Sequence, residues 1–226
     1  MIISITQQTA NMNFTSPMEF WFDFGSNYSY LAIMRFEAMA AERNIDVVLK
    51  PFLLGPIFKS FGWETSPFVL QEKKGEYTWR DMERQCDKYG LPWKKPSVFP
   101  RRALLPARVA IAAKDQGWLA PFCRQIMHAN FVDDREIDDV ATVADVLARL
   151  HVAPDEWLAL AQGEAAKMAL RNQSDEAVRR GIFGAPTFFV GDEMFWGNDR
   201  LDDALAFGEQ ERGCIGHGTV TVRGII

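Results

Sequence analysis

Ser26 is the first side chain in the sequence whose type and setting could support chemistry. It follows the aromatic run Phe22-Asp23-Phe24-Gly25 and precedes Asn27-Tyr28-Ser29-Tyr30, so it stands where a strand would turn into a helix. A nucleophilic serine would need a G-x-S-x-G elbow and a well-placed histidine, and the sequence offers neither here. Two interpretations remain. Ser26 caps the helix, or its hydroxyl serves an anion held at the helix start.

The cysteines and histidines form no catalytic or metal-binding motif. The three cysteines are far apart in the sequence: Cys86, Cys123 and Cys214. Three thiols without a C-x-x-C pair do not make a disulfide framework, so we expect a reducing, cytoplasmic location. The three histidines are scattered as well, and we therefore expect no metal site.

A second candidate site surrounds Pro186. Ala185-Pro186-Thr187 comes directly before the strand-like run that ends at Val190. An X–Pro bond is the one peptide bond with ready access to the cis form, which suits a tight turn. Pro186 then shapes the start of the strand, whether or not the loop also binds a ligand.

Five charged or polar residues are further candidates. Asn198 and Asp199 can cap the closing helix, where an acidic residue is favourable in any case. Lys59 follows an apolar run and, taken alone, would be a solvated edge residue. Arg101 and Arg102 stand near a helix start and oppose its dipole, at a cost of a few tenths of a kcal/mol. They either bind a substrate carboxylate through their paired N–H groups or form a solvated pair.

The elements that must position these residues begin with a strand–helix–strand unit. We predict a strand over Met18–Phe24, a helix over Tyr28–Arg43 and a strand over Ile45–Leu49 that Pro51 stops. This is the length of a βαβ unit with parallel strands and a right-handed crossover.

A helical region and a closing hairpin follow. Between about residues 55 and 180 we predict helices at Tyr77–Tyr89, Leu104–Asp115, Trp118–Phe131, Val140–Leu150 and Asp155–Arg180. Strands return at Thr187–Val190 and Glu193–Trp196, joined by the turn signal Gly191-Asp192, and a last helix runs to about Phe207. The tail from residue 209 to 226 contains GTVTVRGII, which alternates like a strand.

Composition limits the partners. The chain has 226 residues, of which 48% are hydrophobic, and a net charge of -5, which argues against nucleic acid as the main partner. No apolar run reaches membrane-spanning length, so we expect no membrane partner. Residues 1–17 carry no Lys or Arg and make a poor signal peptide.

Three segments resemble 2-hydroxychromene-2-carboxylate isomerases and kappa-class glutathione transferases, which share the DsbA-like thioredoxin fold. These are Phe22–Ala32, Pro51–Lys59 and Phe183–Leu201, and the resemblance covers about residues 18–207. It implies an α/β, thioredoxin-like fold (βαβ…ββα) with a large all-helical insertion domain. Residues 18–54 and 181–208 would form the thioredoxin-like domain, residues 55–180 the helical insertion domain, and residues 1–17 and 209–226 tails of unknown structure.

The resemblance also implies glutathione as the cofactor. Ser26 would donate to the thiolate of glutathione, and the loop with cis-Pro186 would expose the backbone of Ala185 to pair with its peptide. Lys59 would face the glycyl carboxylate, while Asn198 and Asp199 would hold the γ-glutamyl end. A charge-assisted hydrogen bond of about 1.5–3 kcal/mol and a helix end of about 0.3–1 kcal/mol would lower a thiol pKa near 8.5 by about one to three.

The sequence departs from these families at two positions. Arg102 stands where a small polar residue, often Asn, is usual, and Asn27 where Pro is common. In thiol oxidoreductases of this fold a C-x-x-C motif occupies the positions of Ser26 to Ser29, so dithiol exchange by this chain alone is excluded.

The resemblance finally implies a function. The leading hypothesis is a glutathione-dependent isomerase that converts a 2-hydroxychromene-2-carboxylate-like hemiketal to the trans-benzylidenepyruvate form by transient thiolate addition. Its substrate would be a small aromatic carboxylate, held by Arg101 or Arg102, and the protein would be a homodimer. The first alternative is a kappa-like glutathione transferase or peroxidase. The second is a non-catalytic thioredoxin-fold binding module.

Overall fold

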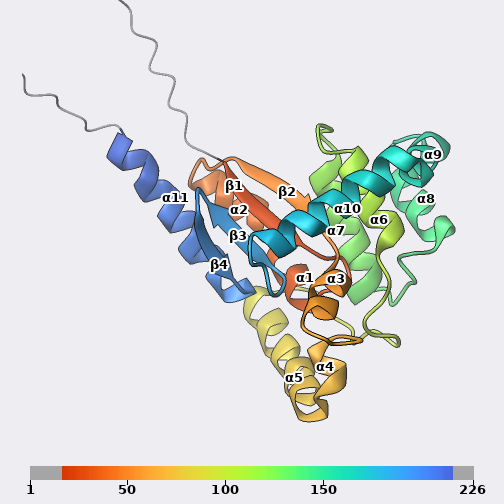
Figure 1. Cartoon of the computed structure of the whole chain (residues 1–226), viewed down its shortest axis with the longest axis horizontal. Coiled ribbons are helices and arrows are strands. Elements are labelled where there is room, and N and C mark those ends of the chain that lie inside the picture. The colour runs from red at the N-terminus through yellow and green to blue at the C-terminus, as the bar shows by residue number, and fades with distance from the viewer. Residues whose placement is uncertain (1–16, 216–226) are drawn as a thin grey trace, which may run out of the picture.

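A four-stranded mixed sheet lies at the centre of the molecule, with its strands in the order β2-β1-β3-β4 (Figure 1). The computed structural model describes residues 17–215. The strands are β1 (Met18–Phe22), β2 (Val47–Pro51), β3 (Thr187–Val190) and β4 (Glu193–Trp196). β1 pairs in parallel with β2 and antiparallel with β3, and β3 and β4 form an antiparallel hairpin. The predicted fold class, with βαβ first and ββα last, is confirmed.

Helices cover both faces of the sheet. Phe20 and Phe22 of β1 enter the main core on one face, together with side chains of helices that follow in the chain. Trp21 points to the other face and packs with Phe52 and Phe189 in a second cluster. This alternation follows from the pleat of a strand, whose successive side chains point to opposite faces. β1 is therefore buried on both faces, and its end is held in a fixed position.

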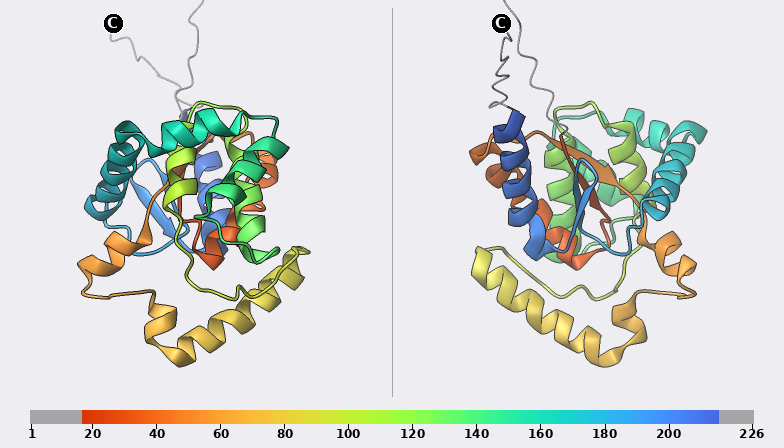
Figure 2. Two further views of the ribbon diagram at one scale, coloured as in Figure 1. Left: turned by 90° about the vertical axis from the view of Figure 1, so that its right-hand side faces the viewer. Right: turned by 60° about the vertical axis from the view of Figure 1, so that its left-hand side comes forward.

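Eleven α-helices and one short 3-10 helix complete the described part of the chain. They are α1 (Asn27–Ile33), α2 (Phe36–Glu42), α3 (Leu54–Ser60), α4 (Pro67–Leu70), α5 (Glu72–Tyr89), α6 (Leu104–Ala112), α7 (Leu119–Phe131), α8 (Val140–Arg149), α9 (Pro154–Gln162), α10 (Glu164–Arg179), η1 (Asn198–Arg200) and α11 (Leu201–Ile215). Figure 2 shows α4 and α5 as an arm that projects from the rest of the fold. Within residues 17–215, no helix combines the length and the apolar character needed to cross a bilayer.

The helix predicted over Tyr28–Arg43 is two helices, α1 and α2, with a break at Met34 and Arg35. The side chain of Arg35 explains the break. Its Nε donates to the Leu31 carbonyl at 3.0 Å, the carbonyl that its own backbone N–H would use in a continuous helix. The Arg35 backbone N–H turns to the Ala32 carbonyl instead, at 3.1 Å.

Other predicted boundaries also differ from the structure. The stretch Asp155–Arg180 is divided into α9 and α10 by Gly163, whose backbone is extended. The strand predicted over Ile45–Leu49 runs over Val47–Pro51, so that Pro51 ends the strand as its last paired residue, opposite Phe22. β2 is an edge strand, where a residue without a backbone N–H is tolerated. The closing helix runs to Ile215, and the strand-like tail lies outside the described residues.

The sheet and the helical region share a continuous core. Phe24, at the end of β1, packs edge-on against Phe122 of α7 with ring centroids 6.3 Å apart. Tyr30 of α1 contacts Phe131 of α7 with tilted rings whose centroids are 5.5 Å apart. The division into a thioredoxin-like domain and a helical insertion domain stays a prediction of topology, because these contacts join the two parts directly.

Candidate active site

A cleft of about 590 Å³ opens beside the carboxyl end of β1. The N-terminus of α1, the loop before β3, α3, the arm of α4 and α5, and the loop before α6 all contribute to its wall. Most of the lining is apolar or aromatic: Leu53, Leu54, Pro56, Phe58, Phe68, Tyr77, Phe99, Leu104, Phe183 and Trp196. A cleft of this size and character is typical of a small-molecule site.

Ser26 lies in this cleft at the end of a turn that Asp23 organises. The buried Asp23 carboxylate accepts the N–H of Gly25 at 2.7 Å and that of Leu54 at 2.7 Å. The Asp23 carbonyl accepts the N–H of Ser26 at 3.0 Å. Desolvation raises the pKa of Asp23, while these two backbone donors to its carboxylate oppose the rise. The side chain thereby ties the end of β1 to the start of α3.

The hydroxyl of Ser26 makes two hydrogen bonds. It accepts the N–H of Ser29 at 3.2 Å, which is the N-cap contact of α1. It also lies 3.1 Å from the Ala185 carbonyl, to which it donates. Ser26 is therefore a helix cap and, at the same time, a donor aimed at the loop before β3.

The Ala185–Pro186 peptide bond is cis, as predicted. Pro186 accepts the N–H of Gly197 through its carbonyl at 3.0 Å, and the Thr187 hydroxyl donates to the Gly184 carbonyl at 2.9 Å. The N–H of Ala185 has no hydrogen-bond partner within residues 17–215. Ala185 thus presents a backbone edge to the cleft, with its carbonyl occupied only by the Ser26 hydroxyl.

The residues predicted to hold the two ends of glutathione do not line this cleft. Lys59 is exposed on α3, outside the lining set. The side-chain oxygen of the buried Asn198 accepts a hydrogen bond from the Arg35 guanidinium at 2.6 Å. The exposed Asp199 forms an ion pair with Arg200 at 3.0 Å. The structure brings Ser26 and Ala185 together, while Lys59, Asn198 and Asp199 lie outside the cleft lining, so the roles of these three residues stay predictions.

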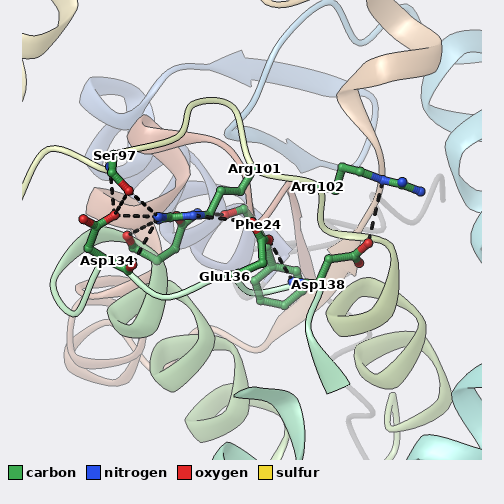
Figure 3. A network of polar contacts seen from close by, with 8 residues as sticks. Phe24, Ser97, Arg101, Arg102, Asp134, Glu136 and Asp138 are labelled. Carbon is green, nitrogen blue, oxygen red and sulfur yellow. Dashed lines mark hydrogen bonds and ion pairs between the residues drawn. The ribbon is translucent and has the colours of Figure 1, made fainter. Parts of the chain in front are cut away.

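Arg101 and Arg102, adjacent in sequence, have opposite surroundings (Figure 3). The Arg101 side chain is 3% exposed and pairs with Asp134 at 2.5 Å. The Arg102 side chain is 77% exposed, with Asp138 at 3.8 Å as its ion-pair partner. Both Nη atoms of the buried Arg101 guanidinium donate hydrogen bonds inside the protein, whereas the guanidinium of Arg102 is available to a ligand in the cleft.

Comparison with known protein families matches residues 18–206 to the DsbA-like thioredoxin domain. The chain belongs to the DsbA-like thioredoxin family. It is 30% identical to a 2-hydroxychromene-2-carboxylate isomerase of Sphingobium xenophagum over 199 residues, which cover 83% of this chain and 95% of that relative. It is 26% identical to glutathione S-transferase kappa 2 of Caenorhabditis elegans over 207 residues, which cover 84% of this chain and 90% of that relative.

The fold agrees with these relatives. A solved structure of a 2-hydroxychromene-2-carboxylate isomerase superposes with a TM-score of 0.78 at 24% identity, covering 91% of this chain and 99% of the other. The predicted family and fold class are confirmed, and these relatives are enzymes, an isomerase and a glutathione transferase.

Close to Ser26, two buried polar side-chain atoms of this DsbA-like chain have no hydrogen-bond partner among the described residues. The amide nitrogen of Asn27 and the hydroxyl of Ser29 are both buried without a hydrogen bond. Asn27 also lines the cleft. No local pattern in the sequence indicates that these groups are unpaired, because pairing depends on distant segments.

Lys74 is a cleft residue that sequence reasoning missed. It stands exposed on α5, lines the cleft and has no ion-pair partner within 4 Å among the described residues. A lysine in an amphipathic helix gives no local signal of this position, since only the projection of the arm places it there. With Arg102 it supplies the unburied positive charge of the cleft.

Among the described side chains, Cys86 and Cys123 are the thiols that could compete with the Ser26 site. Burial raises the pKa of Cys86 to about 11 and raises that of Cys123 as well, so neither thiol is ionised near neutral pH. Residues 17–215 contain no group of three or more side chains placed to hold a metal ion.

Proposed function

We propose that this protein is a glutathione-dependent isomerase acting on a small aromatic carboxylate of the 2-hydroxychromene-2-carboxylate kind. The observation that carries the proposal is the pairing of Ser26 with the Ala185 backbone edge inside a largely apolar cleft. The similarity to 2-hydroxychromene-2-carboxylate isomerases over most of both chains supports the reaction class.

Ser26 and the backbone of Ala185 fit the thiol and the peptide of glutathione. The Ala185 carbonyl and its unpartnered N–H are the two groups that an extended peptide needs for β-type pairing. If a ligand N–H takes over the Ala185 carbonyl, the Ser26 hydroxyl is released and can donate to a neighbouring sulfur. A charge-assisted hydrogen bond of this kind contributes about 1.5–3 kcal/mol, which corresponds to lowering a thiol pKa by about one to two.

Bound glutathione would supply a thiolate that adds to the conjugated carbon of the substrate, permits rotation about the former double bond and departs by elimination. The chain's own task is to hold the reacting groups. Ser26 stabilises the anionic sulfur, and the aromatic wall binds the ring of the substrate. Arg102, with Lys74, holds the carboxylate.

A kappa-like glutathione transferase is the second candidate. The similarity to a kappa-class transferase over 90% of that relative favours it, and the same Ser26 site would serve an electrophile other than a conjugated acid. Activity towards halonitrobenzenes without isomerisation of hydroxychromene carboxylate would favour this candidate.

The test is a calorimetric titration with glutathione, with thiolate absorbance followed over a range of pH. We expect binding, and a bound thiol pKa below the free value of about 8.5. Ser26→Ala should raise that pKa by about one or more and remove most of the turnover. Ser60→Ala is the matched control, because the Ser60 hydroxyl bonds only to the Ile57 carbonyl and lies outside the cleft.

Each outcome has a defined meaning. Absence of binding at millimolar glutathione would overturn both enzyme candidates and leave a binding module of this fold. Binding with an unchanged thiol pKa in Ser26→Ala would overturn the role of Ser26 alone.

We further propose a homodimer in a reducing, cytoplasmic environment. The protein lacks the C-x-x-C pair that oxidative folding enzymes of this fold use, and it keeps two buried free thiols. Sedimentation velocity at micromolar concentration would detect a dimer, and a single monomeric species would refute it.

A further inference from the structure

Arg101 is a buried cation that the proposed chemistry does not use. It precedes α6 in the loop that carries Phe99, Pro100 and Arg102 along the cleft wall. A buried arginine is costly unless its charge is paired, so the contacts of Arg101 indicate its role. Both of its Nη atoms donate hydrogen bonds, and its Nε lies 3.8 Å from the Glu136 carboxylate without a hydrogen bond. Figure 3 shows these contacts on both sides of the guanidinium.

One side of the guanidinium fixes the loop to the end of α7. Nη2 of Arg101 donates to the Asp134 carboxylate at 2.5 Å and to the Ser97 hydroxyl at 3.2 Å. Ser97 in turn donates its backbone N–H and its hydroxyl to the same carboxylate, at 2.8 and 2.9 Å. Lys94 adds an ion pair to Asp134 at 3.3 Å. The loop from residue 94 to 101 is therefore closed around one carboxylate.

The other side reaches the turn that ends in Ser26. Nη1 of Arg101 donates to the backbone carbonyl of Asn130 at 3.1 Å and to its side-chain oxygen at 3.0 Å. These contacts orient the Asn130 amide, whose nitrogen donates to the Phe24 carbonyl at 2.9 Å. Phe24 is two residues before Ser26, so a chain of three side chains joins Asp134 to the Ser26 turn.

The main chain of Arg101 contacts the same turn. A Cβ atom at Gly25 would lie 2.8 Å from the Arg101 carbonyl oxygen, closer than such atoms approach in practice. Glycine at position 25 lets the loop and the turn meet directly. Arg101 thus holds the Ser26 turn through its side chain and touches it through its backbone.

We propose that Arg101 is a positioning residue that sets the Ser26 turn against the cleft wall formed by Phe99, Pro100 and Arg102. The inference rests on the proposed function for its catalytic meaning. It assigns the two adjacent arginines different roles. Arg102 contacts the substrate, and Arg101 holds the Ser26 turn and the cleft wall in a fixed position relative to each other.

An arginine is required at position 101 because the side chain must donate hydrogen bonds in two directions, to Asp134 and to Asn130. A lysine at position 101 could keep the charge pair with Asp134, but a single ammonium lacks the rigid fork that also reaches Asn130. Arg101→Lys therefore removes the link to Phe24 while it keeps the charge.

The experiment compares Arg101→Lys and Asn130→Ala with the parent. We expect amide exchange at Gly25 and Ser26 to become about tenfold faster relative to amides of β3 and β4. We also expect the pKa of the bound thiol to rise by about 0.5 to 1, and kcat to fall about tenfold with little change in the KM for glutathione. The double variant should show little further change, because both residues belong to one network.

Arg135→Lys is the control, because Arg135 pairs with Asp145 at 2.6 Å in a part-buried bridge that does not contact the turn. A uniform rise in exchange across the fold, with an unchanged thiol pKa, would show a merely structural role and overturn the inference. If the parent itself shows no thiolate signal, the proposed function fails. The exchange pattern at Gly25 and Ser26 then decides the positioning role by itself.

Discussion

Ser26 carries two hydrogen bonds that serve different ends. The bond from the Ser29 N–H caps α1, and the bond to the Ala185 carbonyl places a donor at the peptide edge. An N-cap contact is worth about 0.5–2 kcal/mol, so Ser26→Ala lowers stability as well as function. The thiol pKa of the bound ligand separates the two effects, since loss of a cap alone leaves it unchanged.

The two exposed cations of the cleft, Arg102 and Lys74, are expected to bind the carboxylate of the substrate. We expect Arg102→Asn and Lys74→Gln each to raise the KM for a carboxylate substrate about five- to tenfold and to leave kcat within about twofold, because a charged contact near the surface contributes about 1 kcal/mol. The methyl ester of the same substrate should not distinguish the variants from the parent. The ratio of KM values for acid and ester is the measurement.

The control is Arg84→Gln, an exposed change on α5 outside the cleft lining. Equal effects on acid and ester would mean that Arg102 and Lys74 shape the cleft without recognising the carboxylate.

Sequence reasoning reached some of these residues and not others for a physical reason. Ser26 and Pro186 stand in local strings that specify a strand–helix junction and a turn. The difference between Arg101 and Arg102 depends on Asp134, which lies 33 residues away from Arg101, and no local pattern shows which arginine is buried. Lys74 reaches the cleft only through the path of the arm.

At the scale of elements, the contact between Gly25 and the loop before α6 can be tested directly. Gly25→Ala would place a Cβ atom 2.8 Å from the Arg101 carbonyl, a backbone atom that can move only with its loop. We expect a loss of about 1–3 kcal/mol in the free energy of unfolding, as for other overpacking changes. Chemical denaturation measures this loss.

Gly117→Ala gives the comparison, because a Cβ atom there meets nothing within 4 Å. Equal stability of the two variants would show that the loop yields freely and does not fix the turn.

The hydrogen bonds around the Asp134 carboxylate predict that the stability of the fold depends on pH in the acid range. The hydrogen bond from Arg101, with further donors from Ser97 and Lys94, holds the pKa of Asp134 well below its usual value of about 4. A carboxyl with a depressed folded-state pKa stabilises the fold above its unfolded pKa, and this contribution is lost as pH falls through the folded value. We expect the stability difference between the parent and Asp134→Asn to be constant above about pH 5 and to shrink below about pH 4.

Urea midpoints measured across this pH range test the prediction. Asp192→Asn, in the exposed turn between β3 and β4, should follow the parent at every pH. A difference that grows towards acid would contradict the sign.

The elements themselves were predictable where the signal is local. The hairpin of β3 and β4 has the predicted bounds, since aromatic runs flank a two-residue turn. The break between α1 and α2 was not predictable, because Arg35 is held by Asn198, 163 residues further along the chain. Long-range partners of this kind decide helix ends that propensity alone would continue.

For the whole molecule, the shared core predicts that the sheet and the helical region unfold together. Phe122 of α7 is fully buried and packs on Phe24 at the end of β1, across the predicted domain boundary. Phe122→Ala should cost about 3–5 kcal/mol. It should lower the unfolding midpoint of both parts by the same amount, because this ring belongs to the one core that both parts share.

Hydrogen exchange of peptides from α7 and α8 and of peptides from β1 and β3 reports the two parts separately. Coincident midpoints in the parent and in Phe122→Ala would show one cooperative unit, in which the arrangement of the cleft depends on the whole fold. A transition of the helical region that moves while the strands keep their midpoint would instead establish two folding units. The cleft would then lie between parts that open separately, and the position of Ser26 would no longer depend on α7.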